Sequence, residues 1–279
     1  YRSSRARWRS AASQSPTVLY IRTDLAGSLE AGGSLSHMKG MMNPFQEKGI
    51  RVVLLSDSAV SGLPPRVEQV QLHPWQICDF YDELQLLAYN FQLILSARTI
   101  ARRYSPTIVY QRHSSHNFAG GVLARRSQAP CILEVNASEV WVRRNWNRLF
   151  FDDLAVRCER LALQNADRIA VISTHVREQL DSYRLDPGKF IVTPNGVNPE
   201  EFHPGIDGTS IRKQHRLDRR IVVGFIGTFH RWHGVETLFD AALLALKKNQ
   251  RLRFFFIGDG ELRSALMQRA HEHRLQEKV

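Results

Sequence analysis

The chain has 279 residues, and 38 lysines and arginines against 27 aspartates and glutamates give it a formal net charge of +11. A hydrophobic content of 43% and a charged content of 23% exclude disorder throughout the chain. No apolar run approaches the roughly 20 residues that a membrane-spanning helix needs, and the length suggests about two domains. The net charge raises nucleic acid and anionic membranes as partners.

Most of the excess charge lies in two short segments. The arginines from Arg2 to Arg9 precede the first acid of the chain, and residues 212–220 hold five cations and one acid. The first segment is typical of a basic tail over residues 1–15, whereas a nucleic-acid-binding face needs cations spread over a folded surface. We therefore expect no specific nucleic acid partner.

The three cysteines, Cys78, Cys131 and Cys158, lie far apart without metal-ligand spacing. They predict reduced, buried thiols in a cytoplasmic protein and no metal site. The chain starts at Tyr1 and shows no apolar core of a signal peptide, so we interpret it as a fragment.

In chain order, short apolar runs alternate with amphipathic stretches. The predicted strands are Thr17–Arg22, Ile50–Ser56, Ile108–Tyr110, Cys131–Val135, Arg168–Ile172, Phe190–Thr193, Ile221–Gly227 and Leu252–Ile257. Several are apolar on both faces, as strands between two helix layers must be. Helical spacing follows Gly234 and Gly260, whereas Pro44 is expected to kink or end the helix after the first strand. This alternation predicts an α/β protein with parallel sheets.

Turn-forming residues cluster at 186–188, 193–196 and 202–205. The segment from 186 to about 220 is therefore predicted to join two sheets. Residues 16–185 then form a complete N-terminal domain, and residues 186–279 form the first part of a C-terminal domain. We expect this second domain to be incomplete, because two strand–helix units are few for a doubly wound sheet.

Glycines mark the turn after the first strand. The run from Gly27 to Ser34 nearly spells a phosphate-binding P-loop, but Gly33 stands at the lysine position, which disfavours nucleoside triphosphatase chemistry. The pair Gly32-Gly33 can present backbone N–H groups and a helix N-terminus to an anion. A tight turn that merely needs glycine is an equally good interpretation.

A second glycine turn, Gly258-Asp259-Gly260, follows a predicted strand and opens a helix. Arg263 occupies the third glycine position of a dinucleotide fingerprint, so a dehydrogenase is disfavoured. The turn either offers N–H groups to a phosphate or a sugar, or is a capped helix start.

The stretch from Gly227 to Gly234 also follows a strand and holds His230, Arg231 and His233. Loops at the carboxyl edge of a parallel sheet are where α/β proteins bind ligands. A cation and two imidazoles in one polar loop favour ligand binding over packing alone.

Taken together, these pieces resemble a group 1, family 4-like glycosyltransferase, the retaining family of the GT-B fold, from about residue 17 onward. The matching stretches are Ala31-Gly32-Gly33-Ser34 with His37, Tyr110-Gln111-Arg112, Leu133 to Ala137, Ala166 to Ser173, Pro194-Asn195-Gly196-Val197, Phe202-His203-Pro204, Gly227-Thr228-Phe229, Trp232 to Val235, and Gly258-Asp259-Gly260. The resemblance implies two Rossmann-like domains with parallel sheets, the second truncated here, facing each other across a cleft.

In this resemblance the donor is a nucleotide-sugar, held mostly by the second domain, and no cofactor is needed. The donor-binding residues it implies are Gly32, Gly33, Asn195, Thr228, Arg231, His233, Gly258, Asp259 and Gly260. Thr228 stands where relatives usually carry an arginine and His233 where they carry a lysine. Because neutral histidine supplies less charge than lysine, Arg231 or a protonated His233 is expected to serve the diphosphate.

The implied reaction moves the sugar to an acceptor hydroxyl with retention of configuration. Preorganised N–H groups and cations stabilise the charge that grows on the departing phosphate, without a metal. The acceptor, a saccharide or a lipid-linked molecule, is expected beside His37, Arg112, His116, Glu134 and Asn136. His113 is predicted to lie nearest the reacting sugar, and His113 and Arg231 are the predicted catalytic residues. Helix caps and loop hydrogen bonds are the alternative role of the acceptor-side residues.

Relatives hold the donor with two glutamates from a later part of the second domain, for which we find no counterpart before Val279. We therefore expect this chain to bind the donor poorly.

The segment Trp141 to Phe151 mixes aromatic and basic residues and predicts peripheral contact with an anionic membrane at its inner face, although Asp152 and Asp153 follow at once. The alternative function is a non-catalytic basic α/β module that binds nucleotides or nucleic acid through Arg2–Arg9 and Arg212–Arg220.

Overall fold

The computed structural model describes residues 15–25, 32–77 and 80–275. The predicted basic tail, the start of the first glycine turn and Cys78 lie outside these residues. The chain divides into two compact units, residues 1–198 and 199–279, each of which is described by itself.

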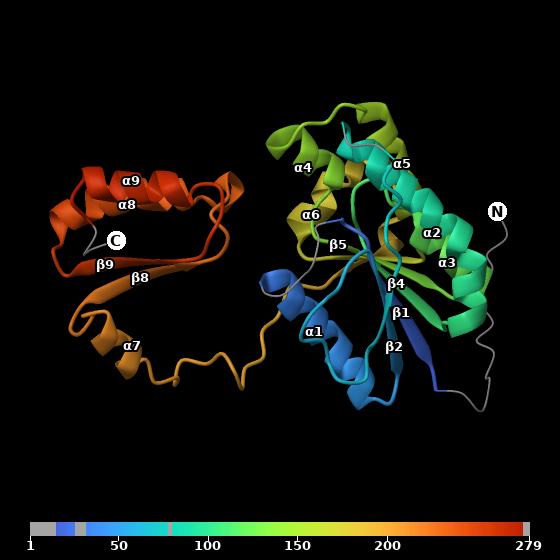
Figure 1. The fold of residues 1–279 in the computed structure, drawn as a ribbon, viewed down its shortest axis with the longest axis horizontal. Coiled ribbons are helices and arrows are strands. Elements are labelled where there is room, and N and C mark those ends of the chain that lie inside the picture. Colours follow the sequence, from blue (N-terminus) through green and yellow to red (C-terminus); the bar gives the residue numbers. More distant parts are fainter. Residues whose placement is uncertain (1–14, 26–31, 78–79, 276–279) are drawn as a thin grey trace. The chain divides into compact units, whose positions relative to one another are not determined.

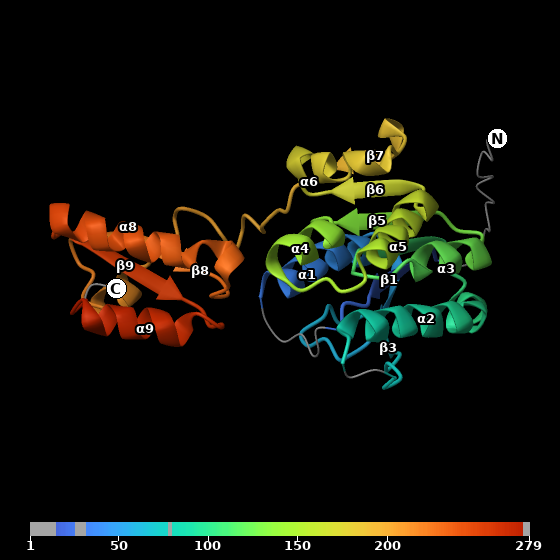
Figure 2. The same ribbon diagram turned by 90° about the horizontal axis from the view of Figure 1, so that it is seen from above.

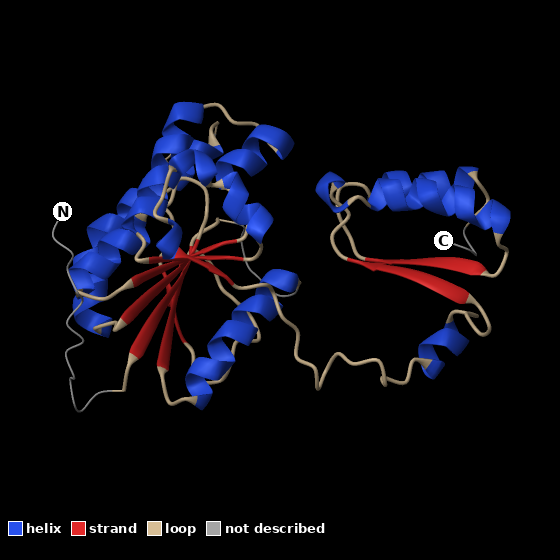
Figure 3. Cartoon of the chain, turned by 180° about the vertical axis from the view of Figure 1, so that it is seen from behind, coloured by secondary structure: helices blue, strands red, loops and turns tan. Residues whose placement is uncertain are grey.

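The first unit contains a parallel sheet of seven strands in the order β3-β2-β1-β4-β5-β6-β7 (Figures 1 and 3). Its strands are β1 (Thr17–Arg22), β2 (Arg51–Ser56), β3 (Glu68–Gln71), β4 (Ile108–Arg112), β5 (Cys131–Val135), β6 (Arg168–Val171) and β7 (Phe190–Val192). Its helices are α1 (Gly33–Glu47), α2 (Asp82–Tyr104), α3 (Ala119–Ser127), α4 (Glu139–Trp146), α5 (Asp152–Asn165) and α6 (Thr174–Gln179), with short 3-10 turns η1 (Asp181–Tyr183) and η2 (Pro187–Lys189). The prediction of an α/β protein with a parallel sheet is confirmed.

The central strands are buried on both faces because helices cover both. Every residue of β1 is buried, and its side chains alternate between two cores. One core packs β1 and β2 against α1, and the other packs the same strands against α2 and α3 (Figure 2). This sandwich explains why β1 and β2 are continuous apolar runs rather than alternating ones.

Two local features differ from the simplest sequence interpretation. Pro44 lies inside α1, which continues to Glu47 and ends at Lys48, so the proline falls in the last turn of the helix. There it removes only one hydrogen bond. Strand β3 was not predicted, because three of its four residues are polar and it has no apolar run. It joins the edge of the sheet by pairing with β2.

The second unit contains a two-stranded parallel sheet of β8 (Ile221–Ile226) and β9 (Leu252–Ile257). Helices α8 (Val235–Lys248) and α9 (Arg263–Glu272) lie on one face of this sheet, and α7 (Thr209–Gln214) and η3 (Arg231–His233) complete the unit (Figure 1). Buried side chains of α8 and α9, including Phe239 and Leu266, form its core.

The units divide after Asn198, later in the chain than residue 185. The reason is β7, which pairs with β6 and so extends the first sheet into the segment expected to link the domains.

Cys131 and Cys158 are buried free thiols, and burial raises the pKa of Cys131 to about 12 and that of Cys158 to about 11. No helix within the described ranges is long and apolar enough to span a bilayer.

Candidate active site

Five polar side chains meet at the carboxyl ends of β4 and β5, and we call them the edge cluster: His37, Tyr110, Arg112, Glu134 and Asn136. The parallel register sets Arg112 beside Glu134. The Tyr110 hydroxyl donates to Glu134 Oε2 at 2.8 Å, and Asn136 Nδ2 donates to Glu134 Oε1 at 3.0 Å. His37 Nε2 from α1 lies 3.0 Å from the same Oε1. Four residues that the sequence assigned to the acceptor side therefore lie together.

Glu134 is the charged centre of the edge cluster. Its side chain is only 3% exposed, and burial opposes its ionisation. The contact with His37, the hydrogen bond from Tyr110 and the charge of Arg112 outweigh burial and lower the pKa of Glu134. Burial and the neighbouring Glu134 raise the pKa of Tyr110, so its hydroxyl keeps the proton it donates. The cluster thus contains a carboxylate at neutral pH.

The half-exposed members of the edge cluster are those that a ligand can reach. His37 is 21% exposed in its side chain, and Arg112 and Asn136 are half-buried, whereas Glu134 and Tyr110 lie beneath them. Arg112 Nη1 donates to Ser34 Oγ at 2.5 Å, which ties its guanidinium to the first turn of α1. A buried anion therefore lies beneath three half-buried hydrogen-bonding groups next to a helix start.

The start of α1 is open. Gly32 has φ +102°, a value that side-chain-bearing residues rarely adopt. No described atom lies within 4 Å of a Cβ built on Gly32 or Gly33, and Gly32, the N-cap residue, has no side chain to cap the helix. The first N–H groups of a helix have no partner within the helix, so those at the first turn of α1 can donate to a ligand. The anion site at Gly32-Gly33 stays a prediction, with a geometry that suits it.

His113 and His116 follow β4 but are engaged elsewhere. His113 Nε2 hydrogen-bonds to Glu159 Oε1 at 3.0 Å, and its side chain is 2% exposed. Although burial disfavours the charged ring, Glu159 raises the pKa of His113. His116 adopts φ +58° and lies 3.7 Å from Glu83, and burial lowers its pKa. Both histidines are therefore buried groups that fix the loop after β4.

Glu159 of α5 joins four segments of the first unit. It accepts hydrogen bonds from His113, from the Ser138 hydroxyl at 2.8 Å, from the Glu139 N–H at 2.7 Å and from the Tyr183 hydroxyl at 2.5 Å. Burial opposes its ionisation, but His113, Tyr183 and Ser138 together lower its pKa. This network holds the loop after β4 against the start of α4.

In the second unit, Thr228 and His233 contact each other across the loop after β8. His233 Nδ1 lies 2.7 Å from the Thr228 carbonyl and 3.0 Å from its hydroxyl. Because a carbonyl oxygen only accepts, Nδ1 carries the proton and donates it to the Thr228 carbonyl. Nε2 of the neutral ring is then an acceptor, and it can donate only in the charged ring. Arg231 is exposed, and His230 stacks on Trp232 with centroids 4.3 Å apart.

The turn Gly258-Asp259-Gly260 packs directly on the loop after β8. A Cβ on Gly258 would lie 1.8 Å from the Gly227 carbonyl oxygen, and one on Gly260 would lie 2.8 Å from the Phe229 nitrogen. Phe229 N–H also donates to the Asp259 carbonyl at 2.8 Å. Close backbone approach accounts for both glycines. Their role in donor binding stays a prediction, as does that of Asn195, which is exposed after β7.

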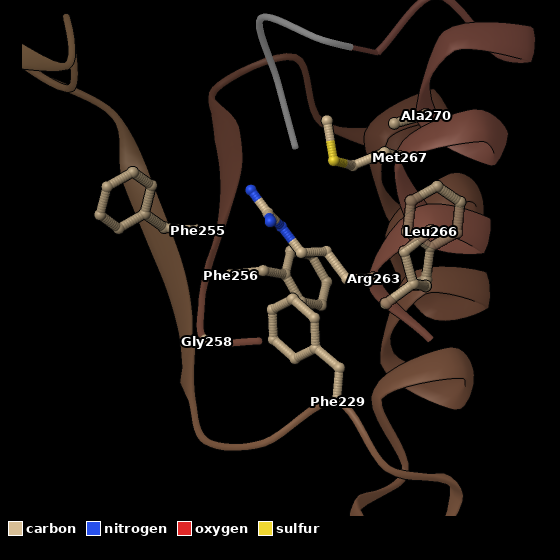
Figure 4. Close-up of a pocket in the computed structure, with 9 residues that line it drawn as sticks. Phe229, Phe255, Phe256, Gly258, Arg263, Leu266, Met267 and Ala270 are labelled. Carbon is tan, nitrogen blue, oxygen red and sulfur yellow. The ribbon is translucent and has the colours of Figure 1, made fainter. Parts of the chain in front are cut away.

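A hollow of about 320 Å³ opens beside this turn (Figure 4). Its lining residues are Phe229, Phe239, Phe255, Phe256, Gly258, Arg263, Leu266, Met267 and Ala270. Except for Gly258, none is a residue that the sequence assigned to the site. Across the part of the chain that the structure describes, no group of three His, Cys, Asp or Glu side chains is arranged to hold a metal ion.

Sequence reasoning gave no role to several residues of the site. Tyr110 and Ser34 stand inside quoted motifs, so their place beside Arg112 had a local signal. Glu159 and Glu83 had no local sequence signal, since each lies on an amphipathic helix far along the chain from the histidine that it contacts.

Comparison with solved structures identifies the fold. Sucrose-phosphate synthase from Thermosynechococcus elongatus matches 95% of this chain with a TM-score of 0.70 and 17% identity, and the chain covers 69% of it. Anabaena HepE in complex with UDP and glucose matches 94% with a TM-score of 0.66 and 15% identity, and the chain covers 67% of it. These likenesses concern the fold, which is the GT-B fold.

The family is shown by sequence. The profile of Glycosyltransferase Family 4 matches residues 31–201, more than half of the chain. The chain belongs to this family, as its motifs indicated. It is also 23% identical to the D-inositol 3-phosphate glycosyltransferase of Geodermatophilus obscurus, over 89% of this chain. It spans 58% of the length of that relative.

Proposed function

We propose that this protein transfers a sugar from a nucleotide-sugar donor to an acceptor hydroxyl with retention of configuration. The observation that carries the proposal is the edge cluster, in which an ionised Glu134 supports Arg112 and His37 beside the open start of α1, within a chain of Glycosyltransferase Family 4. A solved protein of the same fold is described as a complex with UDP and glucose, which supports a nucleotide-sugar donor.

On the donor side, the proposed task is to receive the negative charge that leaves with the nucleoside diphosphate. N–H groups at Gly32-Gly33 and the side chains of Thr228, Arg231 and His233 are the proposed groups. They stabilise the departing phosphate by hydrogen bonds and charge, so the proposed reaction needs neither a metal nor a cofactor. Arg231 has the principal role in this proposal because arginine stays charged at all working pH values, whereas His233 does not.

On the acceptor side, His37, Arg112 and Asn136 are the groups proposed to contact the acceptor. Glu134 lies beneath them, where it accepts from Asn136 Nδ2 and lies 3.0 Å from His37 Nε2. His113 is buried, so we propose that it positions the loop after β4 through Glu159 rather than touching the sugar. The proposed acceptor is a saccharide or a lipid-linked molecule, reached at the cytoplasmic side of a membrane.

Nucleoside diphosphates at millimolar concentration provide the first test. UDP or GDP should raise the melting temperature of the chain, because a ligand that binds the folded state stabilises it. Arg112→Gln should abolish nucleoside diphosphate release from a nucleotide-sugar in the presence of acceptor, whereas the exposed control Arg126→Gln should not. No melting shift with any nucleotide, together with salt-dependent binding to arbitrary DNA, would instead favour the basic non-catalytic module.

A further inference from the structure

Large apolar side chains are exposed together around the N-terminal end of α2 and the turn between α4 and α5, and we call this the aromatic surface. Phe80 is 91% exposed and Ile77 is 61% exposed, far more than a soluble surface needs. The members of the aromatic surface are Trp75, Ile77, Phe80, Tyr81, Trp141, Trp146 and Phe150. They come from two segments more than 50 residues apart in the chain, which contact each other where the Tyr81 ring packs on Phe150.

Hydrogen bonds hold these two segments against each other. The Glu83 carboxylate accepts from the N–H groups of Phe150 at 2.6 Å and Phe151 at 3.0 Å. The ring of Tyr81 packs edge-on against Phe150 with centroids 5.0 Å apart. Arg143 Nη2 donates to Asp82 at 2.8 Å, so α4 is also tied to the start of α2 (Figure 1). These contacts fix the start of α2 against α4 and against the turn that follows α4.

A third tie fixes the segment that carries Ile77. The Ile77 N–H donates to Gln85 Oε1 at 3.1 Å, and Gln85 Nε2 donates to the Trp75 carbonyl at 2.5 Å. The side chain of Phe80, just before α2, has little of the described protein around it. A protruding side chain gains by entering a fluid apolar medium, whereas a protein partner must provide a matching pocket.

The charges of the aromatic surface cancel. Arg144 donates twice to Asp152, at 2.6 Å each, Arg143 is paired with Asp82, and the Arg148 guanidinium lies 5.5 Å from the Phe150 ring centroid. Residues 139–153 contain three arginines and three acids. The aromatic surface therefore has no net positive charge that would attract it to an anionic membrane, the contact that the sequence alone suggested.

We propose that the aromatic surface inserts into the headgroup region of a lipid bilayer by burial of apolar side chains, independently of lipid charge. Tryptophan, tyrosine and phenylalanine with arginine at the rim are the residues that occupy this depth of a membrane. Helix α4 begins at Glu139, three residues after Asn136 of the edge cluster, so the helix that carries Trp141 and Trp146 starts close to the site in the chain. Insertion does not depend on the transferase proposal, but the consequence that the acceptor carries a lipid anchor rests on it.

Flotation of the whole chain with vesicles tests the proposal. We expect equal binding to vesicles of phosphatidylcholine alone and to vesicles with 30% phosphatidylglycerol, unchanged by 0.5 M salt. Ile77→Ser with Phe80→Ser should lower the bound fraction at least fivefold. The matched control, Phe202→Ser with Ile206→Ser, removes the same two types of side chain where they are also exposed, by 64% and 55%, and should leave binding unchanged. Brominated lipid should quench tryptophan fluorescence of the wild-type protein more than that of the double variant.

Three results would overturn the inference. The first is binding only to anionic vesicles and only at low salt, which would assign contact to the basic segments. The second is no binding to either vesicle. The third is a concentration-dependent dimer that the double variant abolishes, which would assign the aromatic surface to a second copy of the chain. Melting shifts with UDP or GDP are measured on the same variants, so failure of insertion is distinguished from failure of nucleotide binding.

Discussion

Glu159→Gln is the sharpest test of how the loop after β4 is held. The substitution keeps the volume of the side chain, so no cavity forms, but it removes the charge from a group that accepts four hydrogen bonds of 3.0 Å or less. A hydrogen bond to a charged group contributes about 1.5–3 kcal/mol and a neutral one about 0.5–1.5 kcal/mol, a difference of about 1 kcal/mol per bond. The expected loss in the free energy of unfolding of the first unit is thus about 3–4 kcal/mol.

Urea unfolding followed by tryptophan fluorescence measures this loss, because Trp141 and Trp146 lie in α4, whose start is bound by Glu159. Glu178→Gln is the matched control, since its side chain is 68% exposed and such surface changes stay within about 0.5 kcal/mol. A loss below about 1 kcal/mol for Glu159→Gln would refute the view that this carboxylate organises the loop.

The same pair predicts a pH dependence. The pKa of Glu159 is lowered from 4.5, so its stabilising contribution is present above pH 4.5 and is lost as the pH falls through its folded value. The pKa of His113 is raised from 6.5, so its contribution is present below pH 6.5 and is lost as the pH rises through its folded value. The cost of Glu159→Gln should therefore be greatest between about pH 4.5 and 6.5. A cost that is independent of pH would contradict a charged pair.

Three further substitutions test the remaining features. Gly258→Ala places a methyl group against the Gly227 carbonyl, so urea unfolding should show the second unit destabilised by about 2 kcal/mol or more, whereas Gly224→Ala, with open space around it, should cost about 1 kcal/mol or less. Glu134→Gln should slow sugar transfer at least tenfold while leaving the melting shift with UDP unchanged, because the acceptor-side groups lose their buried anion; a loss of the melting shift would mean that Glu134 acts on the donor. His233→Lys restores a full charge worth about 0.2–1 kcal/mol at an exposed site, so calorimetry at low salt should show up to about fivefold tighter UDP binding, and unchanged affinity would remove His233 from the diphosphate site.

Most of the fold prediction was based on apolar runs in the sequence. β1 and β5 have the predicted bounds, because burial on both faces leaves an unambiguous apolar run in the sequence. β9 also has the predicted bounds, through the apolar run Phe254–Ile257, although its sheet is less buried. β3 has no such mark, since it lies at the sheet edge and pairs through its backbone. The units divide later in the chain than expected, because the turn-forming residues around Pro187 form η2 before β7 rather than a link between sheets.

The candidate site, like the fold, was predicted from the sequence only in part. Arg112, Glu134 and Asn136, at the carboxyl ends of neighbouring strands, could be foreseen to share an edge, and they do so together with His37 of α1. The partners of His113 and His116 could not, because Glu159 and Glu83 reach them through tertiary packing of helices that carry no local signal.

The uneven size of the two sheets has a dynamic consequence. Strands β1 and β4 have paired neighbours on both sides, whereas β8 and β9, within the described residues, pair only with each other. Half of the amides of β8 and β9 therefore rely on solvent or on side chains for partners, and we expect them to exchange their hydrogens for deuterium much sooner than those of β1. A nucleotide that binds the loop after β8 would then have to order that small sheet as it docks, so slower exchange there would report occupancy before any sugar is transferred.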